Sequence, residues 1–202
     1  MTKFDSEHMS VDDLLEYIKE GTDDRIYAIS QLMWLGVDIF RIYDITKIDM
    51  FFLDKIKKIV DFEKEMEENK GSMEHLIEAK KMGFSDSYVA ELWGRREDEI
   101  YKIRLENNIA PVYKMIDTCA SEFESYVPYF YATYEDENES VRTEKRKIVV
   151  LGAGPIRIGQ GVEFDYSTVH AVQTIRRAGY EAIIINNNPE TVSTDYTTAD
   201  KL

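Results

Sequence analysis

Apolar side chains recur at helical spacing through about the first 110 residues of the chain. Ser10 begins a Ser-x-x-Asp capping box, and Leu14, Leu15 and Ile18 follow on one face of the helix that the box predicts. No segment up to Ala110 has the alternation or the β-branched run of a strand. This part of the chain is therefore predicted to be all α.

The apolar spacing in the same part of the chain predicts two further helices. One is expected over residues 23–35, ended by Gly36, and the other begins after Thr46 as its cap. The acidic run at 63–68 is expected to be the solvated end of the second helix. The apolar side chains expected to face the core are Ile26, Ile29, Leu32 and Met33 in the first helix, and Ile48, Phe51, Phe52, Ile56, Ile59 and Phe62 in the second.

Shorter helices are expected to follow. The capping residues and glycine stops place them at 72–82, 85–92 and 96–107. Two of them, with the glycine turn between them, make the segment from Phe84 to Arg104 similar to a helix-turn-helix. This pattern leaves open an acidic helix-turn-helix regulatory module, fused to a nucleotide-sensing βαβ unit in the later part of the chain. Two packed helices of a bundle are favoured because the second helix begins with three acids.

The period changes after about residue 145. A β-branched run at 147–151 predicts a strand, a glycine-rich loop spans 152–161, a helix covers 169–177 and a second strand follows at 182–185. Strand, loop, helix and strand in this order predict a βαβ unit with parallel strands. The expected fold is thus an all-α helical domain followed by an incomplete, Rossmann-like α/β unit, whose sheet would be completed by residues outside this sequence or by another chain.

Charge divides the chain at the same place. The sequence holds 39 acidic and 25 basic side chains, a net charge of -14, while residues 146–202 hold six of each. All of the excess negative charge therefore lies before residue 146. We expect a helical domain over 1–139, a polar linker over 140–145 and the α/β unit over 146–202.

Composition also excludes several classes of protein. The acidic charge disfavours nucleic acid and anionic membranes as partners, and no apolar stretch approaches the roughly 20 residues of a membrane span. One cysteine and the absence of a signal-peptide pattern predict a cytoplasmic protein. The three histidines are scattered, so no metal site is expected.

The glycine-rich loop is the strongest chemical cue. It does not match the dinucleotide fingerprint, because Arg157 stands where the third glycine belongs and Pro155 removes an amide donor. An NAD- or FAD-dependent oxidoreductase is therefore disfavoured. Two roles stay open: the glycines shape the strand-to-helix turn, or the loop faces a substrate or intermediate with Arg157 and Glu163 as its charged groups. The glycines concerned are Gly152, Gly154 and Gly159.

Two motifs in this part resemble a known family. Arg157-Ile-Gly-Gln-Gly-Val-Glu-Phe-Asp-Tyr166 and Asn188-Pro-Glu-Thr-Val-Ser-Thr-Asp195 are similar to the large chain of carbamoyl phosphate synthetase. Upstream, the segments 24–27, 107–120 and 123–135 resemble the helical oligomerization domain between its two ATP-grasp halves. The resemblance implies that residues 146–202 begin the pre-ATP-grasp part of the second half, which forms carbamoyl phosphate.

This resemblance implies a role without chemistry of its own. The parent enzyme would be an ATP-dependent ligase that makes carbamoyl phosphate from bicarbonate, ATP and ammonia derived from glutamine, for arginine and pyrimidine biosynthesis. ATP and Mg (or Mn) would bind elsewhere in it, so this segment is expected to be inactive and to bind no cofactor. Its expected partners are a second copy through the helical domain, the rest of the large chain, and a glutaminase small chain.

The resemblance also implies a set of passage residues. Arg157, Gly161 and Glu163 match family residues that line the internal route by which carbamate reaches the second active site. A glycine leaves room for a passing molecule, an arginine attracts the carbamate anion, and a glutamate balances charge at low dielectric. No catalytic residue is expected in this segment.

Overall fold

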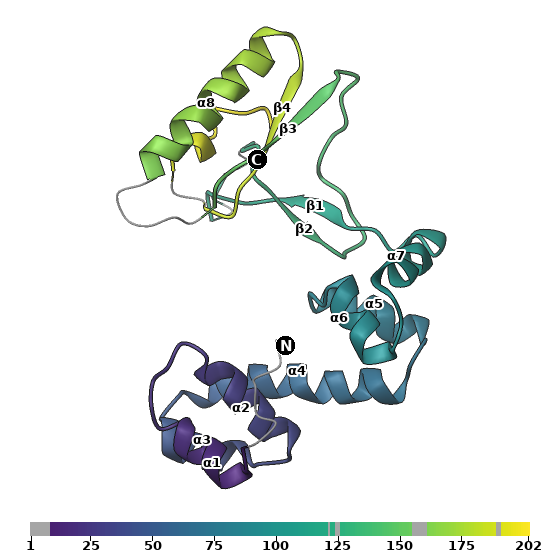
Figure 1. Cartoon of the computed structure of the whole chain (residues 1–202). Helices are drawn as coiled ribbons and strands as arrows, with labels where there is room; N and C mark the ends of the chain where they lie inside the picture. Colours follow the sequence, from purple (N-terminus) through teal and green to yellow (C-terminus); the bar gives the residue numbers. More distant parts are fainter. Residues whose placement is uncertain (1–8, 121, 124–125, 155–160, 189–190) are drawn as a thin grey trace. The chain divides into compact units, whose positions relative to one another are not determined.

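The computed structural model describes residues 9–120, 122, 123, 126–154, 161–188 and 191–202. The chain divides into two compact units, Met1–Ile109 and Ala110–Leu202 (Figure 1). Helices make up the first unit, while the second contains two small sheets and a long helix. This order confirms the expected helical domain followed by part of an α/β unit.

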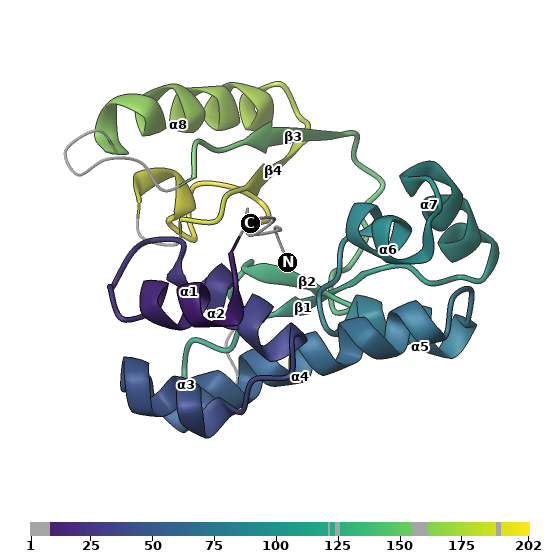
Figure 2. The ribbon, with the colours of Figure 1, turned by 60° about the horizontal axis from the view of Figure 1, so that its bottom comes forward.

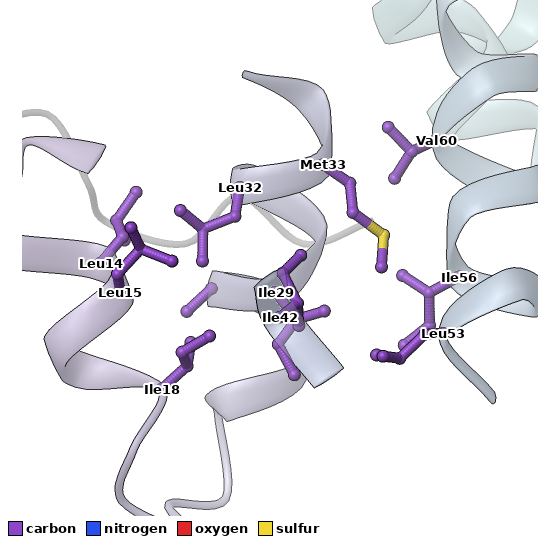
Figure 3. Close-up of a cluster of buried hydrophobic side chains, with 11 residues drawn as sticks. Leu14, Leu15, Ile18, Ile29, Leu32, Met33, Ile42, Leu53, Ile56 and Val60 are labelled. Atoms are coloured by element: carbon purple, nitrogen blue, oxygen red, sulfur yellow. The ribbon is translucent and has the colours of Figure 1, made fainter. Parts of the chain in front are cut away.

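The first four helices of unit 1 share one hydrophobic core. They are α1 (Val11–Tyr17), α2 (Arg25–Trp34), α3 (Ile39–Thr46) and α4 (Met50–Glu68). The predicted capping box begins α1, where the Ser10 hydroxyl accepts from the Asp13 amide at 3.2 Å and the Asp13 carboxylate accepts from the Ser10 amide at 2.9 Å. Figure 3 shows that all four helices contribute to the core, which includes Leu14, Leu15, Ile18, Ile29, Leu32, Met33, Ile42, Leu53, Ile56 and Val60.

The last three helices of this unit begin and end where the sequence predicts. They are α5 (Met73–Lys81), α6 (Asp86–Trp93) and α7 (Glu97–Glu106). Ser72 and Ser85 cap α5 and α6, and Gly83 and Gly94 follow the helix ends in the left-handed conformation that glycine favours. The indole of Trp93 donates to the carbonyl of Met66 at 2.9 Å, which ties α6 to the end of α4.

The start of α4 differs from the prediction. Asp49, not Thr46, caps this helix, because Thr46 is the last residue of α3, a helix that the sequence pattern did not reveal. The inward stripe is consequently set by Leu53, Ile56 and Val60. Residues two positions apart lie on nearly opposite sides of a helix, so the expected core residue Phe51 points to solvent. Phe52 and Ile26, also predicted inward, are exposed as well.

The acidic run at the end of α4 is only partly solvated. Glu63 is buried and Met66 is fully buried, because α6 packs against this part of α4. Burial, followed by the charge and hydrogen bond of Glu63, raises the pKa of Tyr88 well above its ordinary value. The prediction of a solvated helix end is therefore wrong for the first turn of the run.

A buried ionic network fastens α5, α6 and α7 together. The guanidinium of Arg104 donates to both carboxylate oxygens of Asp86 at 2.5–2.9 Å, and the Lys80 ammonium reaches the same carboxylate at 2.9 Å. Arg104 also donates to the Ile109 carbonyl at 2.9 Å. Burial opposes the charge of Asp86, but the hydrogen bonds from Arg104 and Lys80 outweigh it and lower the pKa of this carboxyl.

Unit 2 contains an antiparallel hairpin and a parallel strand pair. Strands β1 (Val112–Met115) and β2 (Phe130–Thr133) form the hairpin. Strands β3 (Lys147–Leu151) and β4 (Glu181–Ile185) pair in parallel, as the βαβ pattern predicts. The connecting helix α8 (Gly161–Arg177) covers one face of this pair with Val172 and Ile175 against Val150, Ala182 and Ile184 (Figure 1).

The boundary between the units lies thirty residues before the expected one. The predicted helical range 1–139 ends at Ile109 in the structure, because the hairpin joins unit 2. The Leu202 amide donates to the Pro128 carbonyl at 2.8 Å, and the Phe130 amide donates to the Leu202 carbonyl at 2.7 Å. Such pairing between residues distant in sequence has no local signal.

The expected linker at 140–145 is also tied to unit 2. The Thr143 hydroxyl donates to the buried carboxylate of Glu181, and the Lys201 ammonium donates to the Ser140 hydroxyl at 3.0 Å. Burial of Glu181 opposes its charge, but Thr143, Lys201 and Lys147 together lower its pKa.

Among the described residues, none of the helices has the length and apolar character that a bilayer span needs.

Replacing Asp86 with asparagine is expected to destabilise unit 1. The substitution removes the negative charge that lies beside the buried cations of Lys80 and Arg104, which costs about 3 kcal/mol. Urea unfolding followed by circular dichroism measures this loss. The matched control is Asp98→Asn, because Asp98 contacts Arg96 and Lys102 on the exposed surface, where an ion pair contributes little.

The stabilisation that Asp86 provides is expected to depend on pH. Because the folded pKa of Asp86 lies below its unfolded value of about 3.9, its stabilisation is present above that pH and disappears as the pH falls through the folded value. The stability difference between the wild type and Asp86→Asn should be constant above about pH 5 and shrink below about pH 4. A difference that does not change with pH would contradict the account.

Candidate functional site

The candidate site lies where the two parallel strands end. Since parallel strands have their carboxyl ends at the same edge, the residues after β3 and the residues after β4 come together there. The Gly152 amide donates to the Ile185 carbonyl at 2.8 Å, which continues the pairing one residue beyond β3. The edge thus places the start of the glycine-rich loop against Asn186 and Asn187.

Gly152 leaves no room for a side chain. A Cβ atom added there would lie 2.6 Å from Nδ2, 2.7 Å from Cγ and 2.9 Å from Cβ of Asn186. Gly154 has a positive φ of 72°, and a Cβ atom there would lie 2.7 Å from Oδ1 of Asn187. These contacts support the turn-forming role that the sequence suggests for both residues. Gly159, which was assigned the same role, lies outside the described residues.

Helix α8 begins at this edge with Gly161, which has open space where Gly152 and Gly154 have close neighbours. At Gly161, the first residue of α8, an added Cβ atom would meet no heavy atom of the described residues within 4 Å, apart from the helix's own backbone and the adjacent residues. Glu163 lies exposed in the first helical turn, where a negative charge complements the helix dipole. Gly161 and Glu163 thus both lie in the first turn of α8, two positions apart and therefore on nearly opposite sides of the helix. The third predicted passage residue, Arg157, lies outside the described residues.

Asp165 is a site residue that the sequence did not single out. It lies one helical turn after Gly161 on the same face of α8 and is buried. Its Oδ2 atom accepts from the Thr191 hydroxyl and from the Ser193 amide at 2.7 Å. Burial opposes its charge, but these hydrogen bonds outweigh burial and lower the pKa of Asp165.

The contacts of Asp165 fix the segment after β4 to α8. Thr191 is the N-cap of the short 3-10 helix η1 (Val192–Thr194), and Ser193 lies within it. The Thr194 carbonyl accepts from the Tyr129 hydroxyl at 2.5 Å. The hairpin, η1 and the start of α8 are thereby linked through side chains. Only the position of Asp165 within the Phe-Asp-Tyr part of the motif could have drawn attention to it, because its partners are 26 and 28 residues away.

The described groups at this edge can accept and donate hydrogen bonds and carry negative charge. They are amide side chains, hydroxyls, two carboxylates and glycine backbone. Within the described residues, no group of three or more His, Cys, Asp or Glu side chains could hold a metal ion. The chemistry available at this edge is hydrogen bonding and charge complementarity.

The helix-turn-helix-like segment offers a different surface. Its second helix, α7, begins with Glu97, Asp98 and Glu99, and its Arg104 is turned inward to Asp86. Carboxylates at this position would repel phosphates. The packing of α6 on α7 therefore favours two helices of a bundle over a DNA-reading element.

Two family models match the chain. Residues 1–108 match the model described as carbamoyl-phosphate synthetase large chain, oligomerisation domain. Residues 144–202 match the model described as carbamoyl phosphate synthase preATP-grasp domain. The first match covers almost all of unit 1, and the second contains β3, α8 and β4, where the candidate site lies.

Replacing Gly152 with alanine is expected to destabilise unit 2 by about 1–3 kcal/mol, because the new Cβ atom overlaps the side chain of Asn186. Thermal unfolding of the two variants compares this site with its matched control, Gly161→Ala. Gly161 has open space and no positive φ, so alanine there should leave the midpoint unchanged or raise it slightly. Equal destabilisation by both substitutions would contradict the described contacts.

Proposed function

We propose a two-part role for this chain, which belongs to the carbamoyl phosphate synthetase large-chain family. Unit 1 joins copies of the large chain to one another and connects its two halves. Unit 2 supplies part of the wall along which carbamate travels to the site that makes carbamoyl phosphate. The bonds of the reaction are formed elsewhere in the enzyme.

The space at Gly161 is the observation that carries the passage proposal. A Cβ atom added there would meet no heavy atom of the described residues within 4 Å, so the start of α8 leaves space beside its backbone. Elsewhere in unit 2, Gly152 and Gly154 pack against asparagines and Asp165 holds η1. We infer that a small planar molecule passes through the space beside Gly161.

The charges near Gly161 suit an anion that is held only weakly. The first turn of α8 directs backbone amides toward the edge, which favours a negative group, and the exposed Glu163 limits how tightly that group is held. By the family resemblance, Arg157 attracts the carbamate. Attraction and repulsion in the same passage allow transit, since tight binding would stop the intermediate.

Unit 1 supplies the self-association. It matches the oligomerisation domain of the family over residues 1–108. We assign it no catalytic residue and no cofactor. ATP and Mg (or Mn) are expected to bind in the ATP-grasp parts of the enzyme, and ammonia is expected from a glutaminase small chain.

The proposal predicts that Gly161→Phe blocks the passage in the complete synthetase. A phenyl ring in the open space should lower carbamoyl phosphate synthesis about tenfold or more while the bicarbonate-dependent ATPase stays within about twofold of wild type. Both rates are measured on the same preparation, with Gly161→Ala as the matched control. An equal loss of both activities would show that the substitution damages the enzyme generally and would refute the passage role.

A further inference from the structure

The hairpin of unit 2 lies outside both family matches. The first match ends at residue 108 and the second begins at residue 144, whereas β1, β2 and their connection span residues 112–133. A segment in this position could serve only to connect two domains. Its hydrogen bonds instead make it part of the α/β unit.

Main-chain hydrogen bonds fix the hairpin to the parallel strands through the end of the chain. Lys201 forms a parallel bridge with Ile183 of β4. The next residue, Leu202, donates its amide to the Pro128 carbonyl at 2.8 Å and accepts from the Phe130 amide at 2.7 Å. The end of the chain therefore lies between β4 and the hairpin (Figure 2).

Tyr129 lies between these two bonded hairpin residues and extends its side chain to η1. Its carbonyl accepts from the Ile116 amide at 2.8 Å, so its backbone is paired within the hairpin. Its hydroxyl donates to the carbonyl of Thr194, a residue that is 1% exposed. The loss of a hydrogen bond at so buried a residue weakens the local structure. The hydroxyl of Tyr129 thus holds the last residue of η1.

Asp165 holds the same short helix from α8. Its carboxylate accepts from the Thr191 hydroxyl and from the Ser193 amide. Asp165 follows Gly161 by one helical turn, about 5.4 Å along the axis, on the same face of α8. Helix η1 therefore packs on the face of α8 that carries Gly161, one turn further along.

We propose that Tyr129 and Asp165 are positioning residues for the passage. Neither touches carbamate; each acts through η1, which forms the border of the route one turn beyond Gly161. When η1 is released, carbamate escapes and reacts with one water to give bicarbonate and ammonia. Its C–N bond breaks, and the water supplies the new C–O bond and the proton for nitrogen. The inference rests on the proposed passage and names residues that keep it closed.

Tyr129→Phe in the complete synthetase tests this role, because it removes the hydroxyl and keeps the ring. Amide hydrogen exchange of residues 191–198, measured by mass spectrometry, should become about tenfold faster. The ATP hydrolysed per carbamoyl phosphate formed should rise about threefold, while the bicarbonate-dependent ATPase stays within about twofold of wild type. A merely structural role would leave that ratio unchanged.

Tyr131→Phe is the matched control, since Tyr131 lies on the same hairpin and is 48% exposed, and it should change neither measurement. Asp165→Asn weakens the hold on η1 from α8 and should change both measurements in the same direction as Tyr129→Phe. Thermal unfolding establishes that each variant is folded.

Unchanged exchange in both Tyr129→Phe and Asp165→Asn would overturn the inference, as would faster exchange with an unchanged ratio. The Gly161→Phe variant separates this failure from failure of the proposed function. If Gly161→Phe blocks synthesis while the other two variants leave the ratio unchanged, the passage stands and the positioning role is wrong. If Gly161→Phe also leaves synthesis unchanged, both are wrong.

Discussion

The close approach of Gly152 to Asn186 is the constraint on which the candidate site depends. Parallel pairing of β3 and β4 brings their following loops to one edge, and the loops fit together only because the first has no side chain at its closest point. Once the loops are in place, Asp165 holds the segment after β4 through Thr191 and Ser193. Close packing at Gly152 and the hydrogen bonds of Asp165 thus fix the segments that follow β3 and β4.

Unit 1 has to fold a strongly acidic stretch of chain into a compact body. It places the acid Asp86 inside, where Arg104 and Lys80 neutralise it and the carboxylate joins three short helices. The remaining acids stay mostly at the surface and discourage contact with other acidic molecules.

The sequence predicted those features that depend on local chemistry. Serine caps, glycine stops and the change of hydrophobic period gave α1, α5, α6, α7 and the parallel strand pair. It failed where two local solutions compete, since both Thr46 and Asp49 can cap a helix and the choice decides whether Phe51 faces inward. It also failed where contacts join distant residues, as in the hairpin and in the bonds of Asp165, because no periodicity records such partners.

The passage is the central claim, and the geometry around Gly161 in the complete large chain tests it most directly. A high-resolution electron cryo-microscopy map of that chain would show what occupies the space beside the first turn of α8. The account predicts a continuous, solvent-filled route bordered by the Gly161 backbone. A side chain from another part of the enzyme packed against Gly161, with no connected space beside it, would contradict the account.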